Sequence, residues 1–293
     1  MTTALEIKNL TKKYADQLVF ENLNFKIKTG EIVALIGKNG AGKSTLINIV
    51  NRIIKPTSGE TIFFENPKID RNRIGLMMQD SYNFRRVTVK EAINLFRSYY
   101  HDPLTYDELI KLADLEKFEN KYMDNLSGGQ RRRLQFALTL SGNPDIIFLD
   151  EPTTGMDPDS RVKFWKAIDQ LKDQGKTFVI TSHYLEELEQ IANRFLFLHN
   201  HHVIFDGNLD DIHHYFSATQ VSFASNLAPE VFEKLPAVSK VREMNHNYQL
   251  LTNDMKAFLP EFAKLSQDID NLEIRNQNLD TVMDEVISQE ESR

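Results

Sequence analysis

Cysteine is absent from the 293 residues, which excludes a disulfide framework and a thiolate metal site and fits a reducing compartment. Long apolar runs are absent too, because no stretch approaches the ~18 residues that a membrane-spanning helix needs. The first ten residues are of mixed polarity, so we expect no N-terminal export signal. We therefore expect a soluble protein whose role at a membrane, if it has one, depends on a partner.

The sequence also lacks a basic surplus. Its 42 acidic and 35 basic residues give a net charge of −7, and residues 211–293 alone carry 14 acids and 7 bases, which leaves 28 of each before them. The acidic excess therefore belongs to the C-terminal part. This asymmetry indicates a domain boundary and argues against a general nucleic-acid-binding surface, and we interpret the acidic tail as a solvated face.

Short apolar strands alternate with helical segments up to about Tyr215. The pattern predicts strands at 5–10, 23–27, 31–36, 59–64, 74–79, 145–150, 176–181, 195–198 and 202–205. It predicts helices from about 87 to 100 and at 106–112, 128–140, 159–171 and 184–192, the first of them capped by Thr88 with Glu91 three residues on. We expect an α/β domain of largely parallel strands, residues 1–215, interrupted by a helical insertion at about 80–140.

The remaining residues, 216–293, are expected to form a small α+β domain. The predicted strands are 219–223, 238–242, 248–251 and 272–274, with helices at 229–235, 255–265 and 279–287. The order β-α-β-β-α-β resembles a ferredoxin-like unit with an extra final helix.

A glycine-rich loop between a buried strand and a helix carries the strongest chemical signal. The strand Glu31–Ile36 leads into this loop, and Leu46–Val50 continues it at helical spacing. Such a loop turns backbone N–H groups toward a phosphate at a helix N-terminus, with Lys43 reaching the outer phosphates and Ser44 holding Mg²⁺. The predicted nucleotide-binding residues of the loop are Gly37, Asn39, Gly40, Ala41, Gly42, Lys43, Ser44 and Thr45.

Two further segments add to this site. The apolar run Ile146–Leu149 ends in Asp150 and Glu151, a position from which Asp150 can anchor Mg²⁺ and Glu151 can polarise an attacking water. Leu126–Gln130 places a serine and two glycines at a helix start. Alone, this second segment favours a simple N-cap; its place between the loop and the carboxylates favours a second anion site.

In order and approximate spacing, these motifs resemble those of the nucleotide-binding subunit of an ABC transporter. The resemblance covers about residues 5–207. It implies a P-loop ATPase core with an antiparallel β subdomain, binding ATP and Mg²⁺. Lys38 stands where many members have proline and Met156 where leucine is common, and neither position belongs to the expected chemistry.

The resemblance also implies roles for individual residues. Tyr14 would stack on adenine; Lys43 would hold phosphates; Ser44, Gln79 and Asp150 would organise Mg²⁺; Glu151 would act as general base and His183 would contact the γ-phosphate. Ser127, Gly129 and Gln130 of the signature, together with Asp157 of the D-loop, would complete the site. Because the signature serves the opposite subunit in this family, two copies would enclose two ATP molecules.

The implied partners are a second copy of the chain and separate integral-membrane permease subunits, with no direct nucleic acid, and the implied location is cytoplasmic, at the inner face of the membrane. The segments Thr153–Pro158 and Thr181–Glu187 and the ending Asn278–Val286 resemble bacterial exporters of the ABC-2 type, so we expect export of a drug, peptide or lipid-like substrate. An importer ATPase and a soluble ABC ATPase acting on nucleic acid or ribosomes are the alternatives. A monomeric P-loop kinase leaves Leu126–Gln130 and His183 unexplained.

Other conspicuous residues favour plainer interpretations. Trp165 is expected in the core beside Val162 and Phe164, and His199, His201 and His202 in a surface turn rather than a metal site. Arg131–Arg133 are expected to form a solvated or dimer-facing helix start. Asn83–Arg86 lies where the family docks a membrane partner, and we expect that role here.

Overall fold

The computed structural model describes residues 2–66, 70–79, 84–182, 185–215, 219–252 and 254–276. The chain divides into two compact units, residues 1–207 and residues 208–293. Among the residues that the structure describes, no helix is both long enough and apolar enough to cross a membrane.

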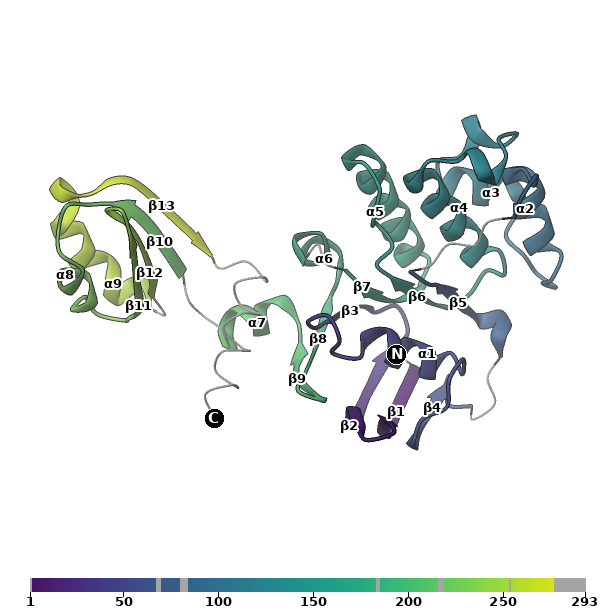
Figure 1. The fold of residues 1–293 in the computed structure, drawn as a ribbon, viewed down its shortest axis with the longest axis horizontal. Coiled ribbons are helices and arrows are strands. Elements are labelled where there is room, and N and C mark those ends of the chain that lie inside the picture. The colour runs from purple at the N-terminus through teal and green to yellow at the C-terminus, as the bar shows by residue number, and fades with distance from the viewer. Residues whose placement is uncertain are drawn as a thin grey trace. The chain divides into compact units, whose positions relative to one another are not determined.

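A six-stranded sheet forms the centre of the first unit (Figure 1). Its strands, in spatial order, are β5 (Ile74–Met77), β6 (Ile146–Asp150), β7 (Thr177–Thr181), β3 (Ile32–Ile36), β8 (Arg194–His199) and β9 (His202–Gly207). The first five run parallel, and β9 pairs with β8 in the antiparallel sense. All residues of β3, β6 and β7 are buried, as expected for parallel strands that are covered on both faces.

A second, antiparallel sheet packs in the same unit. It consists of β2 (Gln17–Lys28), β1 (Thr3–Tyr14) and β4 (Ser58–Phe63), in that spatial order. The helix α1 (Lys43–Val50) shares one hydrophobic core with this sheet and with β3, β6, β7 and β8. The core therefore fixes the start of α1, and with it the glycine-rich loop, against the central sheet.

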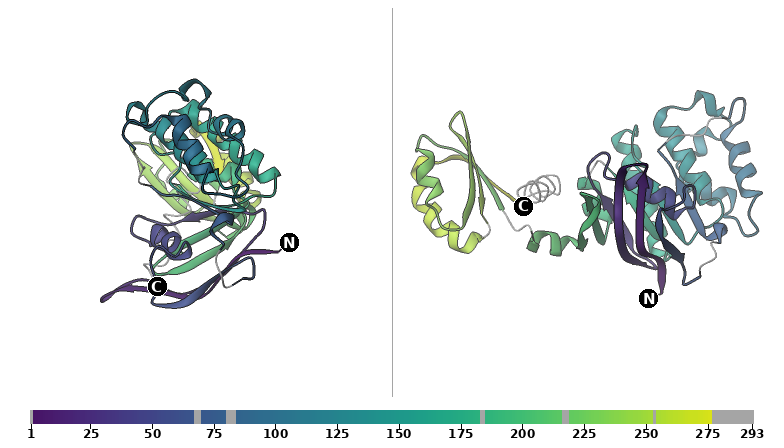
Figure 2. Two further views of the ribbon diagram at one scale, coloured as in Figure 1. Left: turned by 90° about the vertical axis from the view of Figure 1, so that its right-hand side faces the viewer. Right: turned by 60° about the horizontal axis from the view of Figure 1, so that its bottom comes forward.

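Three helices follow β5 and precede β6 along the chain, and they pack beside one another (Figures 1 and 2). They are α2 (Val89–Arg97), α3 (Tyr106–Leu112) and α4 (Gly128–Leu140). Each begins with a capping box, in which the N-cap hydroxyl and the third helical residue bond to each other's backbone N–H groups. Short 3₁₀ turns occur at 71–73, 116–118 and 123–125. The helices α5 (Pro158–Asp173) and α6 (Leu185–Ile191) follow β6 and β7. The predicted mixed α/β core with its helical insertion is confirmed.

The second unit contains one antiparallel sheet and its own core. Its elements are α7 (Leu209–Tyr215), β10 (Thr219–Ala224), α8 (Pro229–Glu233), β11 (Val238–Met244), β12 (Asn247–Thr252), α9 (Met255–Phe262), a 3₁₀ turn (Ala263–Asp268) and β13 (Asp270–Asn276). The spatial strand order is β11-β12-β10-β13. Counted along this unit, that is 2-3-1-4, the order of a ferredoxin-like unit. Its core contains Val221, Phe223, Phe232, Tyr248, Leu250, Phe258 and Phe262.

Several element boundaries differ from the sequence-based expectation, two of them by many residues. The structure divides the chain at Gly207, eight residues before the expected boundary, because α7 belongs to the second compact unit. The strand expected at 5–10 extends over Thr3–Tyr14, with register shifts that keep the longer pairing with β2 continuous. The helix expected at 279–287 lies outside the described residues.

Candidate functional site

Four segments of the first unit meet at the carboxyl ends of the parallel strands. The glycine-rich loop follows β3, Gln79 lies two residues after β5, Asp150 ends β6, and Thr181 ends β7. Because β5, β6, β7 and β3 are neighbours in this order, their ends lie along one edge of the sheet. Ligands of open α/β sheets bind at this edge.

The glycine-rich loop leaves the first N–H groups of α1 available to an anion. Gly40 and Gly42 have φ angles of 85° and 102°, in the left-handed region that glycine adopts without steric cost. Gly42 is the N-cap of α1, and no side chain caps this helix in the described part of the chain. Helix N-terminal N–H groups that lack an internal partner are natural phosphate ligands.

Lys43 is buried in this loop. Its Nζ donates to the carbonyl oxygen of Gly37 at 2.6 Å and to that of Lys38 at 3.2 Å. Burial lowers the pKa of Lys43, and the nearby carboxylates of Glu151 and Asp150 oppose that shift. A buried ammonium held by neutral carbonyls favours an additional anionic partner, which a phosphate would supply.

Asp150 and Glu151 are held from the neighbouring strand by one threonine. The hydroxyl of Thr181 donates to Oδ1 of Asp150 at 2.6 Å and accepts from the N–H of Glu151 at 3.0 Å. The same N–H lies 3.1 Å from the carbonyl oxygen of Thr181. Glu151 has a φ angle of 50°, which is uncommon for a residue with a side chain. The sequence singled out both carboxylates but gave no signal for Thr181.

The expectation that Arg131–Arg133 form a solvated or dimer-facing helix start is wrong for two of the three residues. Arg132 and Arg133 are only 6% and 8% exposed. Arg132 donates to backbone carbonyls at the ends of β5 and β6, and Arg133 pairs with the carboxylate of Asp114. The charges are buried because these acceptors replace water around each guanidinium.

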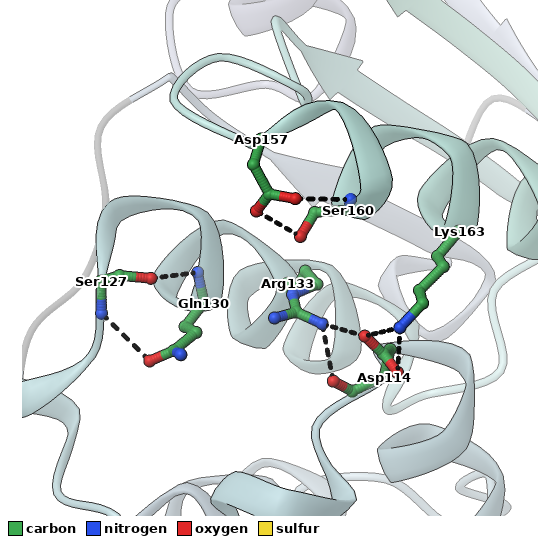
Figure 3. Close-up of polar contacts among 7 residues, drawn as sticks. All are labelled: Asp114, Ser127, Gln130, Arg133, Asp157, Ser160 and Lys163. Carbon is green, nitrogen blue, oxygen red and sulfur yellow. Dashed lines mark hydrogen bonds and ion pairs between the residues drawn. The ribbon is translucent and has the colours of Figure 1, made fainter.

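The signature segment forms the predicted N-cap of α4 (Figure 3). The Ser127 hydroxyl accepts from the N–H of Gln130 at 3.2 Å, and Oε1 of Gln130 accepts from the N–H of Ser127 at 3.1 Å. Gly129 packs closely, since a Cβ there would lie 3.3 Å from the carbonyl oxygen of Gly155. The second predicted role of this segment, contact with a nucleotide on another subunit, stays a prediction.

The remaining candidates lie at other points of the first unit. Asp157 caps α5 and accepts from the N–H and the hydroxyl of Ser160 at 2.9 and 2.7 Å, which lowers the pKa of Asp157 (Figure 3). Tyr14 ends β1 and is 47% exposed, with the Lys12 ammonium 4.4 Å from its ring centre. Ser44 is the second residue of α1. His183 lies outside the described residues.

The bridge at Asp114 was not expected from the sequence (Figure 3). Its carboxylate accepts from Arg133 of α4 and, at 3.1 and 3.0 Å, from Lys163 of α5. Asp114 has a φ angle of 50°, and its carbonyl oxygen also accepts from Arg133 at 2.7 Å. This ion-pair cluster connects the helical insertion to the helix that follows the D-loop.

Two plainer predictions are met only in part. Trp165 is half-buried and its indole N–H donates to Glu187 at 3.0 Å, while Phe164 is buried and Val162 is 55% exposed. His201 and His202 are exposed as expected, with Nδ1 of His201 3.0 Å from the carbonyl oxygen of Val19, whereas His199 is only partly exposed.

Comparisons with known proteins give one consistent result. The family model described as "ABC transporter" matches residues 20–154. The Nod factor export ATP-binding protein I of Rhizobium meliloti (strain 1021) is 34% identical over 216 residues, which cover 70% of this chain and 64% of that relative. The daunorubicin resistance ATP-binding protein DrrA3 of Streptomyces coeruleorubidus is 32% identical, covering 72% and 70% of the two chains.

Solved structures agree with these relatives. An ATP-binding subunit of an ABC transporter is 27% identical with a TM-score of 0.66, covering 73% of this chain and 93% of that one. The ATP-binding cassette MJ0796, in a dimeric post-hydrolysis state bound to ADP and Pi, is 29% identical with a TM-score of 0.63, covering 70% and 98%. The chain spans 64% and 62% of the lengths of two of its Nod factor export relatives.

Proposed function

The chain belongs to the ABC transporter family, and from that premise we propose that it is an ATP-hydrolysing subunit that dimerises around two Mg-ATP and drives separate membrane subunits. The observation that carries this proposal is the buried Lys43, held in the glycine-rich loop with the carboxylates of Asp150 and Glu151 close enough to affect its pKa. Phosphate binding and water activation need this combination of one cation and two carboxylates.

The residues at the strand ends fit a magnesium nucleotide. The N–H groups at the start of α1, which no side chain of the described residues caps, and the Lys43 ammonium suit the phosphates. Ser44, Gln79 and Asp150 supply the oxygen ligands that Mg²⁺ prefers, either directly or through water. When bound, ATP supplies the phosphoanhydride bond, and Mg²⁺ supplies positive charge that stabilises the transition state of its hydrolysis. Tyr14 would stack on the adenine.

Hydrolysis then depends on the groups around Glu151. Its carboxylate would accept a proton from the attacking water, while Thr181 fixes its backbone N–H. His183 would contact the γ-phosphate. Ser127, Gly129, Gln130 and the D-loop Asp157 would close the site of a second copy, so that neither site is complete in a single chain.

We place the docking site of the membrane subunits beside Gln79. A groove of about 460 Å³ is lined by residues from β5, α2 and α4 and from the segments that follow α1 and β5, among them Ile53, Met78 and Phe96. Phe84 and Ile53 are 41% and 51% exposed, which leaves apolar surface for a partner. Phe84 belongs to the segment Asn83–Arg86 expected to have this role; Asn83 itself lies outside the described residues. Binding there would place the chain at the inner face of the membrane.

The names of the relatives support export. Two of them are named for Nod factor export and for daunorubicin resistance. We propose that this chain likewise serves an exporter, with a drug, peptide or lipid-like molecule as cargo.

Substitution Glu151→Gln tests the sandwich mechanism. Removing the general base while keeping the shape should leave ATP bound but unhydrolysed, so the variant should accumulate as a dimer in Mg-ATP, measured by light scattering after gel filtration. Glu186→Gln, an exposed change of the same type on α6, serves as the control and should behave as wild type. A Glu151→Gln variant that binds ATP yet stays monomeric at saturation would contradict the proposal.

A further inference from the structure

Arg132 connects two segments of the proposed ATPase site through a single buried guanidinium. Its Nη1 donates to the carbonyl oxygens of Met78 at 2.8 Å and Gln79 at 3.0 Å. Its Nη2 donates to the carbonyl oxygens of Asp150 at 3.2 Å and Glu151 at 2.6 Å. The side chain comes from α4, five residues after the N-cap Ser127.

These four carbonyls lie just past the last pair of the ladder between β5 and β6. The ladder between β5 and β6 has its last pair at Met77 and Leu149, so Met78, Gln79, Asp150 and Glu151 follow the paired part of these two strands. Carbonyls at a strand end take donors from outside the ladder. The N–H of Thr154 lies 3.4 Å from the carbonyl oxygen of Glu151, and Arg132 donates to all four carbonyls. A guanidinium suits the task, because its planar fork presents N–H groups to both chain ends at once, whereas a lysine ammonium is a single point.

The direction of the guanidinium is itself fixed. Oε1 of Gln135, one turn further along α4, accepts from Nη1 of Arg132 at 2.9 Å. With the side chain 6% exposed, water has little access to it. The fork is therefore held in one orientation by the same helix that carries the signature segment.

The backbone of Glu151 has an uncommon conformation that these hydrogen bonds help to hold. Its backbone is in the left-handed region, with a φ angle of 50°, which a residue with a Cβ adopts only when its surroundings hold it there. Thr181 holds its N–H, and Arg132 holds its carbonyl oxygen. Together they hold the backbone from which the carboxylate projects, and the carboxylate itself accepts from the hydroxyl of Thr154 at 3.5 Å.

We propose that Arg132 is a positioning residue for ATP hydrolysis, which sets the carboxylate of Glu151 and the side chain of Gln79 relative to each other. The proposal rests on the function proposed above. Arg132 acts through the backbone carbonyls of these residues and need not touch the nucleotide. Substitution of Arg132 should therefore lower the rate of the chemical step more than the affinity for ATP. ATP binding depends instead on the glycine-rich loop, which follows β3.

The test compares full-length Arg132→Lys and Arg132→Ala with wild type by steady-state Mg-ATPase kinetics, ATP binding and thermal melting. A misplacement of about 1 Å can lower a rate roughly 100-fold, so kcat should fall by about that factor in Arg132→Ala. Arg132→Lys keeps the charge but reaches fewer carbonyls, and its kcat should lie between the two. KM and the Kd for ATP should stay within about threefold of wild type in both variants.

Arg133→Ala is the matched control. Arg133 is as deeply buried on the same helix but bonds to Asp114. This variant should lose thermal stability and keep the kcat of its folded fraction. If the rates of the Arg132 variants also follow only their folded fraction, Arg132 is merely structural and the inference is overturned.

The Lys variant decides the outcome if Arg132→Ala does not fold. A natively folded Arg132→Lys with the wild-type kcat overturns the inference while leaving the ATPase proposal intact. If wild type itself shows no Mg-ATPase activity, the proposed function fails instead. A lowered kcat with unchanged ATP affinity supports the positioning role.

Discussion

At the scale of single residues, the site depends on partners that lie far apart in the sequence. The glycine-rich loop, Asp150 and Glu151 could be proposed as site residues from the sequence because each motif is contiguous and its expected chemistry follows from local spacing. Thr181 and Arg132 could not, because each acts by reaching a strand end that is distant along the chain. Three adjacent arginines looked like a solvated helix start; only the carbonyls of the folded sheet show why Arg132 is buried.

The hydroxyl of Thr181 leads to a prediction for magnesium binding. Thr181→Val keeps the shape but removes the 2.6 Å bond to the buried carboxylate of Asp150. Loss of a bond that orients a metal-ligating group typically lowers metal affinity 10- to 100-fold, so half-maximal ATPase activity should need at least about tenfold more Mg²⁺. A Mg²⁺ titration of the ATPase rate measures this.

Thr181→Ser is the matched control, because it keeps the hydroxyl and should show the wild-type Mg²⁺ dependence. An unchanged titration curve for Thr181→Val would show that Asp150 is oriented without this bond, or that it does not serve the metal.

At the scale of elements, local signals predicted helix starts better than element lengths. The box formed by Thr88 and Glu91 was expected and is present, since both partners lie within one turn. The start of α7 carries a similar signal: Asn208 and Asp211 accept from each other's N–H groups. The residues Asn208 and Asp211 therefore indicate in the sequence where α7 begins. The full length of β1, in contrast, depends on its pairing with two other strands.

The capping box of α3 gives a prediction for pH dependence. Hydrogen bonds from the Thr105 hydroxyl and backbone N–H lower the pKa of Glu108. A carboxyl with a lowered folded-state pKa stabilises the fold above its usual pKa, and this contribution disappears as pH falls through the folded value. Because Glu108 is exposed, we expect Glu108→Gln to cost only about 0.5 kcal/mol at pH 7 and less at pH 3.

Denaturant unfolding at the two pH values measures this difference. Asp102→Asn, in the exposed loop before α3, controls for the loss of one negative charge. An equal penalty for Glu108→Gln at both pH values would mean that shape, rather than charge, supports the cap.

At the scale of the whole molecule, the chain combines two units with separate cores. The proposed ATPase residues all belong to residues 1–207, and the core of the second unit uses only residues after Asn208. The acidic asymmetry and the change in strand pattern indicated this division in the sequence. The expected boundary at Tyr215 and the boundary in the structure at Gly207 differ by about the length of α7. The sequence did not separate α7 from the first unit because this helix directly follows β9, the last strand of the central sheet.

Separate cores imply separate unfolding. A chain ending at Tyr215 should therefore keep ATP affinity and the thermal transition of the first unit, since no residue proposed to bind the nucleotide is removed. In the full chain, Phe223→Ala should lower the melting temperature of the second unit alone, because it removes a ring packed against Phe232, Tyr248 and Phe262 and a buried Phe→Ala change costs roughly 3–5 kcal/mol.

Calorimetry combined with ATP titration distinguishes the two transitions, because bound nucleotide should raise only the melting temperature of the first unit. Leu259→Ala, an exposed apolar change in α9, is the control for Phe223→Ala and should leave both transitions in place. If the chain ending at Tyr215 lost ATP binding, or if Phe223→Ala lowered both transitions together, the two units would be one cooperative domain, and the C-terminal unit would have to be counted as part of the nucleotide site.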